Sequence, residues 1–222
     1  MSSAAFVDAG GTLTPIPTLI SFIHFYGGTP ATHIDEMQQK LAGGASRKDV
    51  NEDYYRAFAG ERWSDVQEAG FRWFAENNTG SFYRPEMLDR IRAHKAAGES
   101  IVLVSGSWPV CLDPIVSDLQ VTDVLCSNPF VDDSGVLTGE LERVMIAEGK
   151  SEAVAEYASV HGLNLGECSA YGDDISDLEM MEMMGNPVAI AGYGLDDIAR
   201  QRGWELIVPA PGSESVWGAG VG

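Results

Sequence analysis

From Pro85 onward, short apolar runs alternate with segments of helical length and helical periodicity. The runs are continuous and rich in β-branched residues, as at 101–104, which is typical of parallel strands covered on both faces. Strands that alternate with helices form a parallel sheet with right-handed crossovers. We therefore predict an α/β fold built on a parallel sheet.

Residues 17–84 follow a different pattern. Apolar residues recur there at helical spacing in stretches that glycines separate, and no run is typical of a strand. We predict a discontinuous core formed by residues 1–16 and 85–222, with residues 17–84 inserted as a helical domain that caps the sheet.

Composition narrows the classes of partner. The formal net charge is −19, from 33 acidic and 14 basic residues. Such a surface repels phosphate backbones and anionic lipids, so we expect neither nucleic acid nor a membrane as partner. An anionic substrate would need a local cation, from a metal or from one of the few basic residues.

Cysteine usage and apolar run length bear on the compartment. The three cysteines form no CxxC pair, and their odd number favours free thiols in a reducing environment. The first residues carry no basic stretch, and no run reaches the ~18 apolar residues that a membrane span needs. We expect a cytoplasmic protein.

Three polar residues come directly after predicted strands. Asp8 and Ser105 each end an apolar run, and Asp173 follows the run that contains Tyr171. Open parallel sheets bind ligands beyond the carboxyl ends of their strands. We expect these side chains to meet at one edge of the sheet although they lie far apart in sequence.

Four short motifs occur in order: FVDAGGTLT at 6–14, VLVSG at 102–106, Gly149-Lys150, and YGDDISDL at 171–178. Their order and spacing resemble those of the haloacid dehalogenase superfamily. The GNPVA stretch at 185–189 resembles the phosphoserine-phosphatase-like branch, subclass IB. The resemblance covers nearly the whole chain. It implies a Rossmann-like core with a helical cap, and a Mg²⁺-dependent phosphatase that hydrolyses a small phosphorylated metabolite.

The resemblance also implies roles for matching residues. The catalytic residues would be Asp8, which forms an aspartyl-phosphate, Lys150 and Ser105. The phosphate would be held by Thr12, Ser105, Gly106 and Lys150. The Mg²⁺ ligands would be Asp8, the main-chain carbonyl of Gly10, Asp173 and Asp177. These roles agree with the preference of Mg²⁺ for oxygen ligands and with the need to compensate charge during phosphoryl transfer.

Each residue taken alone has a structural alternative. Asp8 could form a turn after a strand, and Ser105 could cap the following helix. Lys150 could be a solvated lysine. The acidic cluster of Asp173, Asp174 and Asp177 could lie at a helix N-terminus because the helix dipole favours it. The four motifs in order favour the functional interpretation, while Asp174 stays open between an N-cap and a role near the metal.

Gly10 departs from the family pattern, which has a second aspartate at this position. That aspartate protonates the leaving oxygen and then activates water, and such help is worth roughly 10²–10⁴-fold in rate. Three explanations are open. Another group, His24, Glu61 or Asp174, could supply the proton; the substrate could need none; or Gly10 could be an engineered or inactivating change.

Pro17 is a second departure. The phosphoserine phosphatases have a glutamate here that meets the substrate amine, so phosphoserine is disfavoured as the substrate. Candidate substrate contacts in the cap are His24, Tyr26, Tyr54, Tyr55, Arg56, Arg62 and Trp63.

The sequence is therefore consistent with three functions. The first is a phosphomonoester hydrolase. The second is a phosphotransferase, a phosphonate-cleaving enzyme or a phosphate-eliminating enzyme, for which a missing acid is tolerable. The third is an inactive homologue that binds phosphate without turnover.

Overall fold

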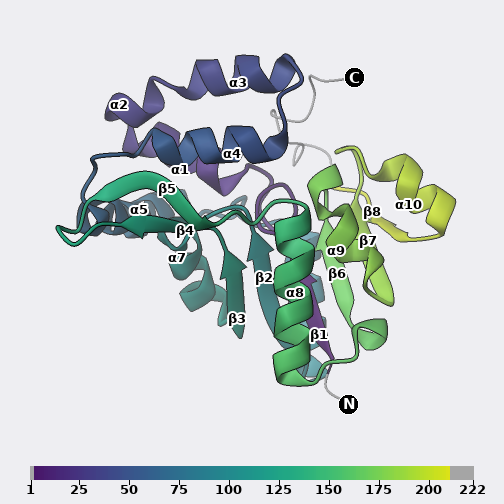
Figure 1. The fold of residues 1–222 in the computed structure, drawn as a ribbon. Coiled ribbons are helices and arrows are strands. Elements are labelled where there is room, and N and C mark those ends of the chain that lie inside the picture. The colour runs from purple at the N-terminus through teal and green to yellow at the C-terminus, as the bar shows by residue number, and fades with distance from the viewer. Residues whose placement is uncertain (1–2, 211–222) are drawn as a thin grey trace.

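The computed structural model describes residues 3–210, so residues 1–2 and 211–222 of the predicted core lie outside it. Six strands form one parallel sheet in the order β3-β2-β1-β6-β7-β8. In chain order they are β1 (Ala4–Val7), β2 (Ser100–Ser105), β3 (Asp123–Cys126), β6 (Ser169–Gly172), β7 (Asn186–Ile190) and β8 (Glu205–Ile207). The predicted α/β fold with a parallel, Rossmann-like sheet is confirmed (Figure 1).

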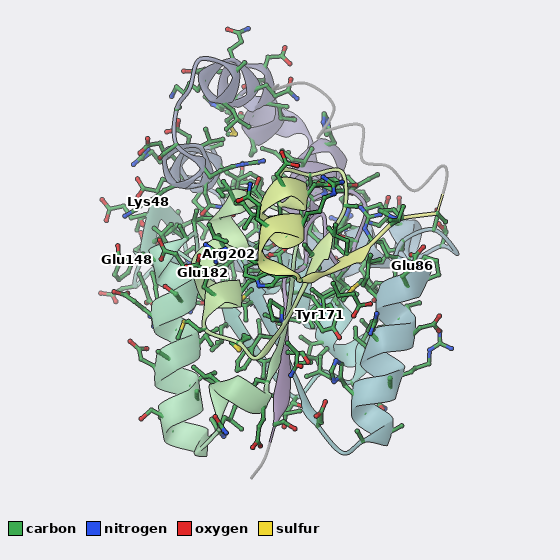
Figure 2. All side chains as sticks on the ribbon, turned by 90° about the vertical axis from the view of Figure 1, so that its right-hand side faces the viewer. Lys48, Glu86, Glu148, Tyr171, Glu182 and Arg202 are labelled. Carbon is green, nitrogen blue, oxygen red and sulfur yellow. The ribbon has the colours of Figure 1, made fainter. Side chains whose placement is uncertain are left out.

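Helices cover both faces of the sheet. One face packs against α6 (Pro85–Ala96) and α7 (Pro109–Leu119), and the other against α8 (Glu148–His161), α9 (Leu178–Glu182) and α10 (Asp196–Arg202). Figure 2 shows α8 and α6 on opposite sides of the sheet, with Tyr171 between them. Successive residues of a strand point to opposite faces, so both faces of the central strands are buried and their sequences are continuously apolar.

The segment after β1 is helical and lies above one end of the sheet (Figure 1). It contains α1 (Thr18–Tyr26), α2 (Gly28–Ala31), α3 (Ile34–Ala42), α4 (Arg47–Arg56) and α5 (Trp63–Asn77). Its aromatic core includes Phe22, Phe58 and Trp73, and Trp108 at the start of α7 belongs to the same cluster. This helical unit therefore shares a hydrophobic core with the sheet domain where the two meet.

A two-stranded antiparallel hairpin also packs against the helical unit. It consists of β4 (Asn128–Val131) and β5 (Leu137–Arg143). Val136 forms an isolated bridge with Arg62, and Leu137 is buried in the aromatic cluster. The attachment of this hairpin to the cap depends on contacts between distant parts of the chain.

The sheet register places three loops together. Val7 of β1 pairs with Leu103 of β2 on one side and with Tyr171 of β6 on the other. The amide of Asp8 continues this pattern and donates to the carbonyl of Tyr171 at 3.0 Å. The loops after β1, β2 and β6 consequently leave the sheet at the same edge. Within residues 3–210, no helix combines the length and apolar character needed to cross a bilayer.

Candidate active site

A buried lysine joins two carboxylates at this edge. The Nζ of Lys150, on the first turn of α8, lies 2.6 Å from Oδ1 of Asp8 and 2.5 Å from Oδ1 of Asp177. Burial alone would lower the pKa of Lys150, but the charges of Asp177 and Asp8 outweigh burial and raise it. The ammonium therefore stays charged and holds the two acids together.

The pKa of the Asp8 carboxyl is set by burial and by its charged neighbours. Burial raises its pKa to about 7, with Asp177 adding to the rise, while Lys150 opposes it. A carboxylate that is to act as a nucleophile must be ionised, so a second cation near Asp8 would favour the reactive form.

Asp173 brings a third carboxylate to the same point. Burial raises its pKa well above the usual value, and Asp8 and Asp177 raise it further. One oxygen atom from each of these three residues lies within 4.8 Å of the others. Lys150 contacts two of these three buried carboxylates, and their hard oxygen atoms suit Mg²⁺. The residues present therefore fit a divalent cation.

The loop after β1 is shaped to receive Asp173. Gly11 has φ of +98°, and a Cβ built on it would lie 2.2 Å from Oδ2 of Asp173. Only glycine leaves room for this carboxylate and adopts the left-handed backbone without strain. Thr12 donates from Oγ1 to Oδ1 of Asp173 at 2.7 Å. Thr12 supports the acid in this way and does not line the cavity described below, which differs from the phosphate contact expected of it.

Asp177 organises the loop after β6. Its Oδ2 accepts from the amides of Asp173 and Asp174, each at 3.2 Å. Asp174 is the N-cap residue of the short 3₁₀ turn Ile175–Asp177 and accepts from the amide of Ser176 at 3.0 Å. The other carboxylate oxygen of Asp174 accepts from Arg47 of α4 at 2.7 Å, which connects the cap to the core at the edge of the site.

The loop after β2 is held from the cap. The carbonyl of Gly106 accepts from Nδ2 of Asn51 at 3.0 Å and from the hydroxyl of Tyr55 at 2.8 Å. Ser105 is buried, and its Oγ accepts from the amide of Ser107 at 3.2 Å. The carbonyl of Gly106 shares its peptide plane with the amide of Ser107, so these bonds together fix the backbone that directly follows the amide of Gly106.

Gly10 and Pro17, the two departures from the family pattern, meet in space. A Cβ at position 10 would lie 3.2 Å from Cα of Pro17 and 3.5 Å from the amide nitrogen of Thr18. The start of the cap therefore occupies the space into which a side chain at position 10 would first extend. An aspartate there would require this segment to shift by a few tenths of an ångström.

One cavity of about 230 Å³ collects most of the predicted residues. Those that line it are Asp8, Gly10, Ser105, Gly106, Lys150, Asp173 and Asp177. Asp174 also lines it, whereas His24 and Glu61 do not, and the Glu61 carboxylate accepts from the hydroxyl of Tyr26 at 2.7 Å. Of the cap residues considered as substrate contacts, only Tyr54 lines the cavity.

Several residues of the site were missed in the sequence. Asn51 and Arg47 line the cavity from α4, and Tyr193 lines it from the loop after β7. Arg84 is fully buried, and its Nε donates to the carbonyl of Gly11 at 3.0 Å while its NH2 group donates to Tyr193. A lone arginine before a helix gives no sequence signal. The helical spacing of Ile34, Met37 and Leu41 on α3, in contrast, could have indicated that this helix forms an apolar wall of the cavity.

The fold and the site together define an α/β enzyme domain with a lysine-bridged acidic centre at the carboxyl edge of a parallel sheet. The model of the haloacid dehalogenase-like hydrolases matches residues 5–182. The chain therefore belongs to the haloacid dehalogenase superfamily, and its relatives place it in the phosphoserine-phosphatase-like branch, as the motifs predicted.

Two curated relatives come from Mycobacterium tuberculosis. A probable phosphatase is 34% identical over 143 residues, covering 59% of this chain and 50% of its own length. The phosphoserine phosphatase SerB1 is 27% identical over 222 residues, covering 93% of this chain and 70% of its own length. The chain thus spans about half the length of the first relative.

Solved structures agree with the fold. A protein of unknown function from Bordetella pertussis Tohama I has a TM-score of 0.83 at 24% identity, covering 94% of this chain and 99% of that chain. A substrate-bound phosphoserine phosphatase has a TM-score of 0.71 at 18% identity, covering 93% of both chains. These likenesses bear on the fold alone.

Proposed function

We propose that this protein is a cytoplasmic, Mg²⁺-dependent phosphatase that hydrolyses a small phosphorylated metabolite through an aspartyl-phosphate on Asp8. Its catalytic core would be residues 1–16 and 85–222, and its cap residues 17–84. The observation that carries the proposal is the buried contact of Lys150 with both Asp8 and Asp177, beside Asp173, in a cavity that Ser105 and Gly106 also line.

The ion would be held by Asp8, the carbonyl of Gly10, Asp173 and Asp177. When bound, it would supply positive charge that offsets the repulsion between the phosphate and the nucleophile. The remaining chemistry belongs to the chain. Thr12 would orient Asp173 for metal binding, because its hydroxyl donates to Oδ1 of that carboxylate. The other oxygen, Oδ2, is not bonded to Thr12.

Asp8 would attack phosphorus, a bond would form between its carboxylate oxygen and phosphorus, and the bond to the ester oxygen would break. Lys150 keeps Asp8 oriented and adds charge compensation, while Ser105 and the amide of Gly106 bind phosphate oxygens. Water would then attack the aspartyl-phosphate, releasing inorganic phosphate and restoring Asp8. Asn51 and Tyr55 act as positioning residues through the carbonyl of Gly106.

Gly10 makes the leaving step unusual because no acid follows the nucleophile by two residues. Aryl phosphates, whose phenolate leaves without protonation, should react much faster than alkyl phosphates, which are expected to lose up to about 10⁴-fold. Water activation is lost as well, so a burst of leaving group should precede slow turnover. Gly10 also favours the second candidate function, which is a phosphotransferase or another enzyme of phosphoryl or phosphono groups that needs no such acid. The third candidate function is an inactive homologue that binds phosphate.

The test is a series of aryl and alkyl phosphates with this chain, Asp8→Asn, Gly10→Asp and Gly10→Ala. Gly10→Ala measures the steric cost of a Cβ against Pro17, and Gly10→Asp adds the acid to that same cost. We expect Asp8→Asn to abolish turnover and Gly10→Asp to raise alkyl phosphate hydrolysis above Gly10→Ala. Rapid alkyl phosphate hydrolysis that Gly10→Asp leaves unchanged would show that another group supplies the proton.

A further inference from the structure

The wall of the cavity that faces the phosphate site is apolar. On the cap side it includes Leu19, Ile20, Ile34, Met37, Leu41 and Val50. The core adds Ile146, and a Cβ on Gly106 would lie 2.5 Å from its Cδ1. Apolar surface therefore begins directly beside the loop that would bind the phosphate.

Three of these side chains have apolar surface that the protein itself does not cover. Ile20, Leu41 and Ile146 are partly exposed, and none of them belongs to a hydrophobic cluster of the described residues. They come from α1, from α3 and from the segment between β5 and α8, so they line the cavity from three separate parts of the chain. A ligand that removes this surface from water would be stabilised by the hydrophobic effect.

Charge on the cap side of the cavity is correspondingly sparse. Among the described cap residues that line the cavity, Arg47 alone is charged, and it pairs with Asp174 at 2.7 Å. The position that carries a carboxylate in phosphoserine phosphatases is Pro17 here. A substrate ammonium would enter this part of the cavity without a carboxylate of the cap to pair with, which is costly once water is excluded.

Besides the side chains of Thr18 and Gln38, two buried uncharged polar atoms interrupt the apolar wall. Within the described residues, Oδ1 of Asn51 and the hydroxyl of Tyr54 are buried and have no hydrogen-bond partner, and both residues line the cavity. The amide of Asn51 cannot be flipped, because its Nδ2 must donate to the carbonyl of Gly106. Its Oδ1 is therefore a free acceptor that an uncharged hydroxyl of a ligand could satisfy.

We propose that the site takes a phosphomonoester whose alcohol portion is uncharged and largely apolar, with at most a hydroxyl group beside Asn51. This inference rests on the proposed phosphate site but not on turnover. It excludes phosphoserine as the preferred substrate on the basis of the cavity wall, in addition to the loss of the family glutamate at Pro17.

The test measures binding of non-hydrolysable alkylphosphonates by calorimetry in the presence of Mg²⁺. Ethyl-, butyl- and hexylphosphonate carry the same charged group, so their affinities differ only through apolar contact. We expect up to about fourfold tighter binding per added methylene, on the order of 100-fold from ethyl to hexyl. The phosphonate analogue of phosphoserine should bind more weakly than butylphosphonate.

Leu41→Asn should reduce this dependence on chain length, whereas Leu141→Asn provides the matched control. Both leucines are partly buried, but Leu141 lies in the hairpin and does not line the cavity. Affinity that is independent of chain length in the unmodified protein, or no binding of any phosphonate, would overturn the inference whatever the variants do. Chain-length-dependent binding without hydrolysis of any phosphate ester would instead contradict the proposed phosphatase and leave the apolar specificity standing.

Discussion

Replacing Lys150 by methionine should destabilise the metal-free protein strongly. The side chains have similar length, but the variant removes the charge that lies 2.6 Å from Asp8 and 2.5 Å from Asp177. Both carboxylates are buried, and Asp173 lies beside them. Breaking a buried ion pair by removing one partner costs about 3–5 kcal/mol, because an uncompensated charge is left inside the protein.

This cost is large against the whole stability of a protein, which is on the order of 5–15 kcal/mol. Urea unfolding in the presence of a chelator, repeated with Mg²⁺, measures it. Since the variant site is more negative, Mg²⁺ should stabilise Lys150→Met more than it stabilises the unmodified protein. The cation replaces part of the charge that the lysine supplied.

The matched control is Lys48→Met. Lys48 is an exposed lysine that Figure 2 shows at the surface, so its replacement should change the free energy of unfolding by no more than about 0.5 kcal/mol. A loss of less than about 1 kcal/mol in Lys150→Met, together with an unchanged effect of Mg²⁺, would refute the electrostatic account of the site.

Three further predictions concern the ligands, the loop and pH. Asp173→Asn should weaken Mg²⁺ binding strongly in calorimetry, and unchanged affinity would argue that this residue is no ligand. Gly11→Ala should lower Mg²⁺ affinity and stability because its Cβ would lie 2.2 Å from that carboxylate, whereas Gly44→Ala, at φ of +89° with open space around it, should show the backbone cost alone. The pKa of Glu99 is lowered by hydrogen bonds from Ser3 and His94, so its ionised form stabilises the fold above the pKa of the unfolded chain. Glu99→Gln should lower the free energy of unfolding by about 1 kcal/mol near pH 7, and this difference between variant and unmodified protein should shrink as the pH falls from about 5 toward 3. A difference that does not change with pH would contradict this prediction.

The sheet could be predicted because its determinants are local. Continuous apolar runs separated by helical segments specify a parallel sheet, and polar residues directly after strands must gather at its carboxyl edge. This reasoning anticipated that Asp8, Ser105 and Asp173 would share one edge, and all three line one cavity. The catalytic roles assigned to them came from the resemblance and remain predictions.

Contacts that depend on packing between distant segments could not be predicted in this way. The attachment of the hairpin to the cap and the buried Arg84 depend on how separate elements meet. Thr12 illustrates the same limit: its hydroxyl could serve the phosphate or Asp173, and only the shape of the loop shows which one it reaches. The contact between Gly10 and Pro17 likewise joins two positions that sequence reasoning treated as separate departures.

The most direct measurement of the central claim is chemical trapping of the phosphorylated enzyme. The protein is mixed with an aryl phosphate and Mg²⁺, quenched in acid within the burst, digested and examined by mass spectrometry. We predict one phosphoryl group on the peptide that contains Asp8, none in Asp8→Asn, and less in Gly10→Asp because water activation removes it. Turnover without a phosphorylated Asp8 in any of these samples, or hydrolysis that persists in Asp8→Asn, would contradict the account.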